Sequence, residues 1–483
     1  MPDLLLEVGT EEMPAGAIES ALSQLKSAIE LGLTAARVPA DCVSVCGTPR
    51  RLIVTATELP ARQPDLSTQV KGPSKSVAFD ASGNPTGAAI GFAKKQGIAV
   101  EDLTILSTDQ GDYVQALVHE VGLPAIEAVS PIITAALKGL SFPKVMRWGN
   151  GANRFVRPVR WIVCMIDGKV TDFEFGGVKA GSKSRGHRFL SPDEFELSTG
   201  SNFARELYSR HVMIDPEKRR EAIVRQSNEL AAELGGNIPW DEGLLDENVW
   251  LVEWPTAVLG SFDPEYLELP RPVLVTAMKK HQRYFPIEDA GGNLKPNFIA
   301  IRSGDDANLD IVRDGYERVL AARFNDAKYF YSQDLESSLP EMRSQLDRLV
   351  FQEKLGNYLQ KSNRLLSLAN FMATSAGVDV ASASRTAELC KADLVSRMVI
   401  ELPALQGVIG REYALKTESP DVADAILEHY LPRFPGDKLP ATPVGRLLAI
   451  ADRIDTLVGY VGIGILPTGS SDPFGLRRAA QGL

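Results

Sequence analysis

The sequence has few of the residues that build self-contained catalytic or metal centres. Its 483 residues include five histidines, and no two of them stand at metal-ligand spacing. Its four cysteines are scattered, which is typical of a protein from a reducing compartment. Only Cys42 and Cys46 are close together, and a lone C-x3-C pair is a weak zinc signal. We therefore expect these cysteines to be ordinary small apolar residues.

Nucleotide-binding loops are also missing. A P-loop needs G-x-x-x-x-G-K-[ST], but the only Gly-Lys pair, at residues 168–169, is followed by Val170. Gly149 and Gly151 begin a G-x-G, but Arg154 stands where the dinucleotide fingerprint requires a third glycine. The chain has no G-x-S-x-G nucleophile elbow. We therefore expect no complete active site in this chain.

Long hydrophobic runs are absent as well. No segment offers the roughly 18 uninterrupted apolar residues of a membrane span. The first residues carry acids where a signal peptide has basic residues, so we expect a cytoplasmic protein. The net charge of -10 argues against indiscriminate coating of nucleic acid. This net charge is compatible with a local basic site, because physiological salt screens the interaction between charges that are more than about 8 Å apart.

The order of apolar runs, turns and helical patterns predicts a multidomain α+β protein. Residues 1–170 alternate strand-like runs with helices near 15–36 and 124–139, which indicates an N-terminal α+β module. Residues 171–335 combine short strands, long loops and a helix near 215–235, which indicates a second α+β module ending in a long helix. Residues 336–483 are helical, so we expect a third, all-helical domain.

The first candidate nucleic-acid site is the stretch "MRWGNGANRFVRPVRW". It contributes Arg147, Arg154, Arg157 and Arg160. If residues 155–165 form one strand, Arg157 shares a face with Phe155 and Trp161, and Arg160 points to the other face. The four arginines then cannot clamp one run of phosphates. Contact with RNA or a partner subunit is one interpretation; structural ion pairs or solvated strand ends are the other.

Two further basic stretches are candidates for contact with RNA or a ligand. "TAMKKHQRYFPI" places cations at a helix end that runs into a strand, where they also suit the negative end of the helix dipole. "SKSRGHRFL" places cations on a loop, where functional contacts are common. The candidate residues in these stretches are Lys279, Lys280, His281 and Arg283 in the first, and Arg185 and Arg188 in the second.

Charged residues also fall within the apolar faces of two predicted helices. In the helix 308–335, Arg323 and Asp334 lie within the stripe of apolar residues, so pairing is expected, with Asp326 as a possible partner for Arg323. The alternative is that this face meets a charged partner. In the helix that Thr442 caps, Leu447, Leu448, Ala451, Ile454 and Val458 form the stripe. Asp452 and Asp455 project along that stripe and stand one turn apart.

Carboxylates one turn apart suit a metal ion, so a metal-dependent phosphohydrolase is an alternative function. Its other ligands are the difficulty, because His429 is the only histidine after residue 300. Asp393 has Arg397 one turn away, which predicts an ordinary ion pair. The patterns therefore favour no metal.

The closing stretch "SSDPFGLRRAAQGL" predicts a helix that begins after Asp472. Ser471 suits the cap, and Pro473 suits the first helical position. Leu476 and Ala479 lie one turn apart, so this short helix either docks through them or frays.

Thirteen motifs along the chain resemble a known family. They are "LLLEVGTEEMPAGAI", "CGTPRRL", "KGPS", "GAAIGFAKKQGI", "MRWG", "FVRPVRWIV", "GHRFL", "VEWPTAVLGSF", "KHQRYFPI", "ERVLAARFNDAKYFYSQDL", "CKADLVSRMVIELPALQGVIGREYA", "AIADRIDTLVGY" and "PTGSSDPFGLRRAAQGL". In this order they resemble the beta subunits of bacterial heterotetrameric glycyl-tRNA synthetases. The resemblance covers the chain from its first residues to its last.

The resemblance implies the non-catalytic subunit of an α2β2 glycine–tRNA ligase. It implies tRNA(Gly) and the alpha subunit as partners, and the alpha subunit would use ATP and magnesium, so no cofactor is expected in this chain. It also implies that the helical domain is HD-like, with Asp393, Asp452 and Asp455 as vestiges of a metal site, and that the α+β modules are B3/4-like in part. Family members continue into a C-terminal anticodon-binding domain that this chain is expected to lack. A stand-alone RNA-binding scaffold is a further alternative.

Overall fold

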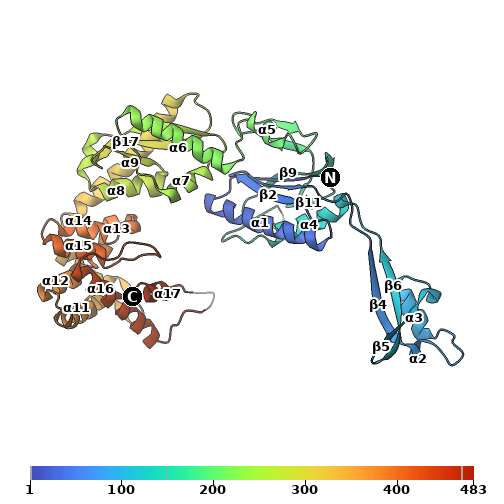
Figure 1. Cartoon of the computed structure of the whole chain (residues 1–483). Coiled ribbons are helices and arrows are strands. Elements are labelled where there is room, and N and C mark those ends of the chain that lie inside the picture. The colour runs from blue at the N-terminus through green and yellow to red at the C-terminus, as the bar shows by residue number, and fades with distance from the viewer. Residues whose placement is uncertain (1–2, 150, 469–471) are drawn as a thin grey trace. The chain divides into compact units, whose positions relative to one another are not determined.

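The computed structural model describes residues 3–149, 151–468 and 472–483, which form a mixed α/β structure of two compact units (Figure 1). Unit 1 comprises residues 1–224, 245–256 and 301–306, and unit 2 comprises 225–244, 257–300 and 307–483. The expected three-part division at residues 170 and 335 stays a prediction. Among the described residues, no helix is long and apolar enough to cross a membrane.

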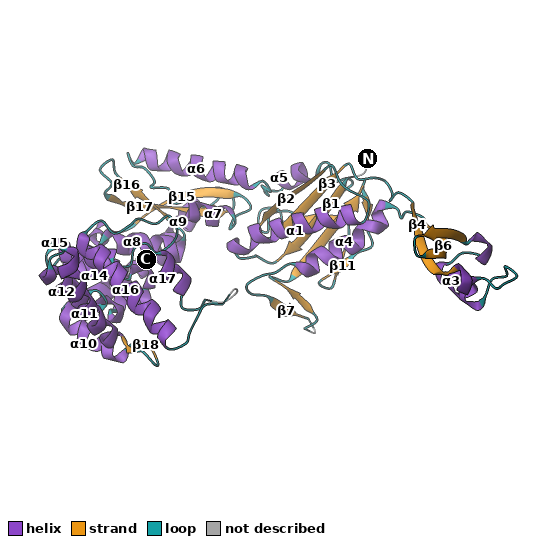
Figure 2. Ribbon diagram, turned by 60° about the horizontal axis from the view of Figure 1, so that its bottom comes forward, coloured by secondary structure: helices purple, strands orange, loops and turns teal. Residues whose placement is uncertain are grey.

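An antiparallel five-stranded sheet with the order β10-β9-β1-β3-β2 forms the centre of unit 1 (Figure 2). Its strands are β1 (Leu4–Thr10), β2 (Cys42–Thr48), β3 (Arg51–Thr57), β9 (Val159–Ile166) and β10 (Lys169–Val170). Helices α1 (Ala15–Ala35) and α4 (Ala125–Gly139) pack on one face, which confirms the predictions for 15–36 and 124–139.

Strand β1 is buried along its whole length because both faces of the sheet are covered. Successive side chains of a strand point to opposite faces. Leu4, Leu6 and Val8 therefore pack with the helices, whereas Leu5 packs with Trp161 on the other side. That second face is covered in part by α5 (Phe203–Tyr208).

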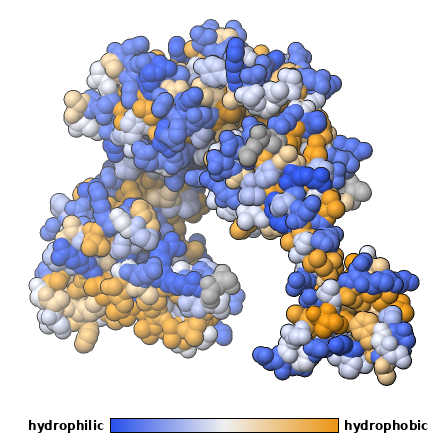
Figure 3. All heavy atoms as spheres, turned by 45° about the vertical axis from the view of Figure 1, so that its right-hand side comes forward, coloured by the Kyte–Doolittle hydropathy of each residue, from blue (hydrophilic) through white to orange (hydrophobic). Residues whose placement is uncertain are grey.

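Residues 66–120 form a module with a small core of its own. Its antiparallel sheet has the order β4-β6-β5, from β4 (Leu66–Ser74), β5 (Thr104–Thr108) and β6 (Gly111–Glu120). The helices α2 (Lys75–Ala78) and α3 (Gly87–Gln96) supply Ala78 and Ala89, which pack against Val114. Figure 3 shows apolar surface on this module, where Ile105 and Leu117 are exposed.

Three short hairpins extend unit 1. They are β7 (Met146–Trp148) with β8 (Asn153–Phe155), β11 (Glu174–Phe175) with β12 (Val178–Lys179), and β13 (Lys183–Arg185) with β14 (Glu194–Glu196). The chain bends between Phe155 and Val159, so residues 155–165 do not form one strand, although β9 covers most of this range. Phe155 packs with the helices and Trp161 packs on the opposite face, so Arg157 does not share a face with both.

Unit 2 begins with a small sheet and continues as helices. The sheet has the order β15-β17-β16, from β15 (Pro255–Ser261), β16 (Phe285–Glu288) and β17 (Leu294–Ser303). Helices α6 (Pro216–Glu233), predicted at 215–235, and α7 (Glu242–Val249) are each divided between the two units, whereas α8 (Arg271–Thr276) and the long α9 (Leu309–Asp334) belong to unit 2. A short hairpin, β18 (Val350–Gln352) with β19 (Gly356–Asn357), precedes α11.

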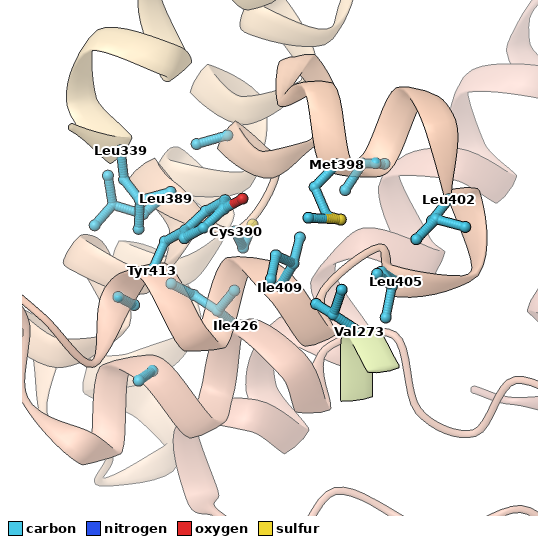
Figure 4. Close-up of a cluster of buried hydrophobic side chains, with 14 of the residues drawn as sticks. Val273, Leu339, Leu389, Cys390, Met398, Leu402, Leu405, Ile409, Tyr413 and Ile426 are labelled. Carbon is cyan, nitrogen blue, oxygen red and sulfur yellow. The ribbon is translucent and has the colours of Figure 1, made fainter. Parts of the chain in front are cut away.

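One continuous apolar core joins the helices of unit 2, from Phe262 to Ala451 (Figure 4). The remaining helices are α10 (Leu339–Ser344), α11 (Tyr358–Ala376), α12 (Val380–Leu389), α13 (Arg397–Glu401), α14 (Val408–Ala414), α15 (Pro420–Glu428), α16 (Pro443–Gly462) and α17 (Leu476–Gln481). Figure 4 shows Val273 of α8 beside Ile409 and Leu405, so the core continues from the first part of unit 2 into the later helices. The finer assignment of these helices to an HD-like domain remains an expectation.

The structure corrects several side-chain predictions in these helices. In α9, Asp334 is buried but Arg323 is exposed, and the Asp334 carboxylate accepts hydrogen bonds from the Arg397 and Met398 amides (2.8 and 3.0 Å). Asp334 thus caps α13 instead of pairing with a cation. Thr442 caps α16 as predicted, but Val458 is 67% exposed and does not belong to the buried stripe.

The C-terminal helix begins later than predicted. Helix α17 starts at Leu476, so Pro473 lies before it, and the predicted cap Ser471 lies outside the described residues. The Asp472 carboxylate accepts hydrogen bonds from the amides of Leu476 and Arg477, each at 2.9 Å. Leu476 is buried, so the short helix docks on unit 2.

Candidate nucleic-acid and partner-binding sites

A fully buried charged triad lies on the second face of the unit 1 sheet. The Arg51 guanidinium donates to Glu7 (Nη1–Oε1 2.8 Å) and to Glu253 (Nε–Oε1 3.0 Å). The Thr48 hydroxyl also donates to Glu253 Oε1 (2.6 Å). Arg51 and Glu7 are 0% exposed and Glu253 is 2% exposed, so a single buried guanidinium faces two buried carboxyls.

The pKa values of the two carboxyls of the triad shift in opposite directions. Burial disfavours the charged form of both, and for Glu7 it prevails, so the pKa of Glu7 is raised. For Glu253, the Arg51 guanidinium and the Thr48 hydroxyl outweigh burial, and the pKa is lowered. Glu253 is therefore the charged partner of Arg51, and Glu7 is the carboxyl that takes up a proton more easily.

Trp161 covers the triad from the neighbouring strand β9. Three guanidinium groups, of Arg50, Arg51 and Arg185, lie 5.3 to 5.6 Å from its ring centroid. The ring also lies directly on Gly9, where an added Cβ would come within 2.0 Å of Trp161 Cδ2. Glycine is therefore required at position 9 for this packing.

The triad also holds the segment that carries the predicted Arg185 and Arg188. Arg51 Nη1 donates to the Arg185 carbonyl at 2.8 Å. Arg185 pairs with Glu194 (2.7 Å), and Arg188 pairs with Glu11 and Glu12 (3.1 Å each). Arg185 thus ends β13 and Arg188 lies in the loop that follows, and both are engaged in ion pairs.

His187 anchors the same loop in the interior. It is 3% exposed, and its Nε2 lies 3.3 Å from the Ser303 hydroxyl. Burial is the main reason that its pKa is lowered. A neutral, buried His187 positions the loop instead of presenting a charge to a ligand.

The β7–β8 hairpin presents two arginines that have no acidic partner among the described residues. Arg147 and Arg154 are directly opposite in the antiparallel register, and both are exposed. They lie in a stretch, residues 128–166, that contains no Asp or Glu but six basic residues: Lys138, Lys144, Arg147, Arg154, Arg157 and Arg160. Like charges directly opposite across a hairpin destabilise it unless a counter-charge is present.

The other two arginines of this stretch are less available. Arg157 is half-buried, and its Nη1 donates to the Val156 carbonyl at 3.0 Å. Arg160 pairs with Glu11 (Nε–Oε1 3.1 Å). The structure therefore brings Arg147 and Arg154 together and leaves Arg157 apart from them.

The predicted basic turn of unit 2 follows α8. Residues 277–282 form a π-helical turn, and Arg283 adopts a left-handed backbone (φ 57°) before β16. Lys279 pairs with Asp241 (3.1 Å), whose pKa is lowered: although burial acts against this, hydrogen bonds from the Leu244 amide and Lys279 prevail. Lys280 is exposed, and His281 is half-buried.

In the helical part of unit 2, lysines hold the two predicted carboxylates of α16. Lys361 Nζ contacts Asp452 and Asp455 (2.8 and 2.9 Å), and Lys391 Nζ contacts Asp452 (2.9 Å). Arg364 also pairs with Asp455 (2.6 Å). The pKa values of both carboxyls are lowered, because these cations outweigh the burial that opposes ionisation.

The third predicted carboxylate, Asp393, lies apart from Arg397, so the expected ion pair is wrong. Asp393 is 1% exposed, and its Oδ2 accepts a hydrogen bond from the Gly407 amide (2.6 Å). Burial raises its pKa to about 6. The nearby His429 is buried too, and burial lowers its pKa well below the ordinary value.

These contacts define what the sites can do chemically. Among the described residues, no group of three or more His, Cys, Asp or Glu side chains is arranged to hold a metal ion. The carboxylates of α16 face lysines, which occupy the positions that a bound cation would need. The arrangement favours binding of phosphate groups at the hairpin over hydrolysis in the helices.

Sequence reasoning missed the triad and the lysines of the helical cluster. A signal for the triad was present, because Glu7 interrupts the apolar strand "LLLEVGT" and a buried carboxylate needs a partner. Its partners are 44 and 246 residues away, so no local spacing identifies them. Lys361 and Lys391 gave no signal, since a lone lysine in a helix is ordinarily solvated.

Comparison with known proteins agrees with the motifs. A family model described as "Glycyl-tRNA synthetase beta subunit" matches residues 4–483. Beta subunits of glycine–tRNA ligase from Desulforamulus reducens and Geobacter metallireducens are each 44% identical to the chain. The alignments cover 100% of this chain and 70% and 71% of those relatives. The same subunit from Desulfitobacterium hafniense is 43% identical, with 70% of its length covered.

Proposed function

The chain belongs to the glycyl-tRNA synthetase beta-subunit family, and on that premise we propose that its β7–β8 hairpin is a contact surface for the tRNA backbone. The chain is the beta subunit of a glycine–tRNA ligase: it binds tRNA(Gly) and supports ATP-dependent attachment of glycine, whose chemistry the alpha subunit carries. The observation that supports the hairpin is the cross-strand pair Arg147 and Arg154, exposed and without an acidic partner among the described residues.

Phosphate is the counter-charge that this pair lacks. Arginine binds phosphate through a planar fork of donors, and contacts of this kind position a nucleic acid. The acid-free stretch 128–166 creates a local positive field in a chain whose net charge is -10. Arg185, Arg188 and Lys279 are weaker candidates because each is already paired.

We propose that the enzyme assembles as α2β2 in the cytoplasm. ATP and magnesium act through the alpha subunit, and this chain binds no cofactor of its own. The helical part of unit 2 is proposed to be an HD-like domain without hydrolytic activity, since Lys361 and Lys391 neutralise Asp452. The α+β modules are proposed to be B3/4-like in part.

Salt dependence of tRNA binding tests the hairpin. Each lost phosphate contact flattens the slope of log affinity against log salt by about 0.7 to 0.9. The variants are Arg147→Ala, Arg154→Ala and their combination, with Arg318→Ala as a matched control because Arg318 is 77% exposed on α9. We expect a stepwise flatter slope and weaker aminoacylation with the alpha subunit in the hairpin variants only.

An unchanged slope in the folded double variant would assign Arg147 and Arg154 to a structural role. Bound divalent metal with phosphatase turnover would instead favour the HD-type phosphohydrolase. Failure of the chain to bind either the alpha subunit or tRNA would favour a different role altogether.

A further inference from the structure

A cavity of about 570 Å³ lies beside the β7–β8 hairpin in unit 1. It is bounded by the end of α4 with the loop that follows it, by β8, and by the turn between β11 and β12. Ligand pockets in proteins typically measure about 300 to 1,000 Å³, so this cavity is large enough for one nucleotide.

Three phenylalanines line the cavity. Phe142 packs edge to face on Phe155, with ring centroids 5.1 Å apart, and Phe155 packs in the same way on Phe175 at 5.5 Å. Phe155 and Phe175 are buried, whereas Phe142 is half-buried and borders the cavity. Such a ring offers a surface on which an unpaired base stacks.

Two basic side chains line the cavity. Lys138 and Arg154 line it, both are exposed, and neither is paired with an acid among the described residues. Arg154 is also one of the two hairpin arginines assigned above to the tRNA backbone. A phosphate bound by Arg154 therefore lies beside the cavity, within reach of a base inside it.

Two further lining side chains can form hydrogen bonds with the edge of a base. Asn153 is half-buried and Glu174 is exposed, both line the cavity, and no described residue hydrogen-bonds to either side chain. Asn153 lies close over Gly177, where an added Cβ would come within 3.0 Å of Nδ2. Gly177 has φ +81°, so its backbone also requires glycine.

We propose that this cavity binds one unpaired nucleotide of the tRNA. The inference rests on the proposed tRNA-binding function of the hairpin and adds to it a specific part of the substrate. The base stacks on Phe142, Asn153 and Glu174 hydrogen-bond to its edge, and its phosphate lies at Arg154 and Lys138.

The chemistry of Glu174 implies a base preference. A carboxylate only accepts hydrogen bonds, so it favours bases with exocyclic amino groups, which are adenine, cytosine and guanine. Uracil presents carbonyl oxygens on both sides of its single N–H donor, and these repel the carboxylate. We therefore expect uracil to bind least well.

Binding of short single-stranded oligoribonucleotides to the full chain tests the proposal. We expect oligo(C) to bind more tightly than oligo(U), and Asn153→Ala to weaken oligo(C) binding about fivefold or more. Glu174→Gln adds an amide donor, so it should reduce the preference for oligo(C) over oligo(U) about tenfold. Phe142→Ala should remove stacking, with a loss of about 5- to 100-fold.

Controls separate binding from folding and from the wider function. Phe371, 76% exposed on α11, provides a matched Phe→Ala control. Phe142→Ala can also weaken packing, so Asn153→Ala and Glu174→Gln, which break no hydrogen bond to a described residue, carry the test if it fails to fold. Equal binding of all oligonucleotides, unchanged in those two variants, would overturn the proposal.

The hairpin variants and the cavity variants test the two proposals separately. If Arg147→Ala flattens the salt slope of tRNA binding while the cavity variants bind tRNA normally, the nucleotide site is wrong and the proposed function stands. If neither set changes tRNA binding, both are wrong.

Discussion

Replacing Arg51 by methionine should destabilise unit 1 more than any surface change. The substitution keeps the approximate length of the side chain but leaves Glu7 and Glu253 buried without a cation. Breaking a buried ion pair by removing one partner costs about 3 to 5 kcal/mol. For a unit of this size the loss corresponds to a fall in Tm of about 6 to 20 °C.

The pH dependence of this loss tests its electrostatic cause. Without Arg51, both carboxyls lose the largest influence that opposes burial, so we expect their folded-state pKa values to rise above the unfolded values. Such groups contribute stability that is present below the unfolded pKa, near 4.5, and is lost as pH rises through the folded pKa. The destabilisation by Arg51→Met should therefore be largest near pH 8 and shrink toward pH 4.5.

Calorimetry and urea unfolding of the full chain between pH 4.5 and 8 provide the measurement. Arg188→Ala is the control, since Arg188 is 40% exposed and an exposed ion pair contributes less than about 1 kcal/mol. Glu7→Gln combined with Arg51→Met should recover part of the loss. If Arg51→Met costs no more than Arg188→Ala, or if its cost is independent of pH, the reasoning about the triad is wrong.

Two further predictions concern the helical part of unit 2. Burial raises the pKa of Asp393 to about 6, so this group contributes up to about 3 kcal/mol to the free energy of unfolding, and this contribution is lost as pH rises from about 4 to 6. Asp393→Asn should remove this pH dependence, as measured by urea unfolding. Identical pH profiles of the variant and the original chain would contradict the prediction. Lys361→Met should lower the free energy of unfolding by about 3 kcal/mol or more, because it removes a cation from Asp452 and Asp455. The control Lys354→Met, at an exposed position, should lower it by under about 0.5 kcal/mol in the same thermal unfolding assay. Equal losses would show that Lys361 is not a structural counter-ion.

Local features of the fold were predictable because their causes are local. The Thr442 side chain caps α16 by accepting a hydrogen bond from the amide three residues later, so neighbouring residues determine both the cap and the start of the helix. The helices near 15–36 and 124–139 followed from apolar periodicity in the same way. Most of the range 155–165 forms β9, but the pattern of its residues does not show that the chain bends after Phe155.

The candidate sites were predictable only as sets of residue types. Basic stretches indicated where arginines gather, but not which of them find an acid. Arg188 reaches Glu11 across 177 residues, whereas Arg154 lies opposite Arg147 in its own hairpin and has no ion pair with a described residue. The difference decides which arginines remain available to phosphate, and it depends on packing of the surrounding elements.

By itself the sequence determined the family, the helix caps and the absence of P-loop and dinucleotide signatures, because ordered motifs and capping residues act through neighbours in the chain. Only the tertiary structure decided that Glu7, Arg51 and Glu253 share one buried site, and that Lys361 and Lys391 face Asp452. The physical reason is the free-energy cost of a buried charge. A buried charge needs a partner of opposite charge, and in this chain the fold supplies that partner from residues far away in the sequence.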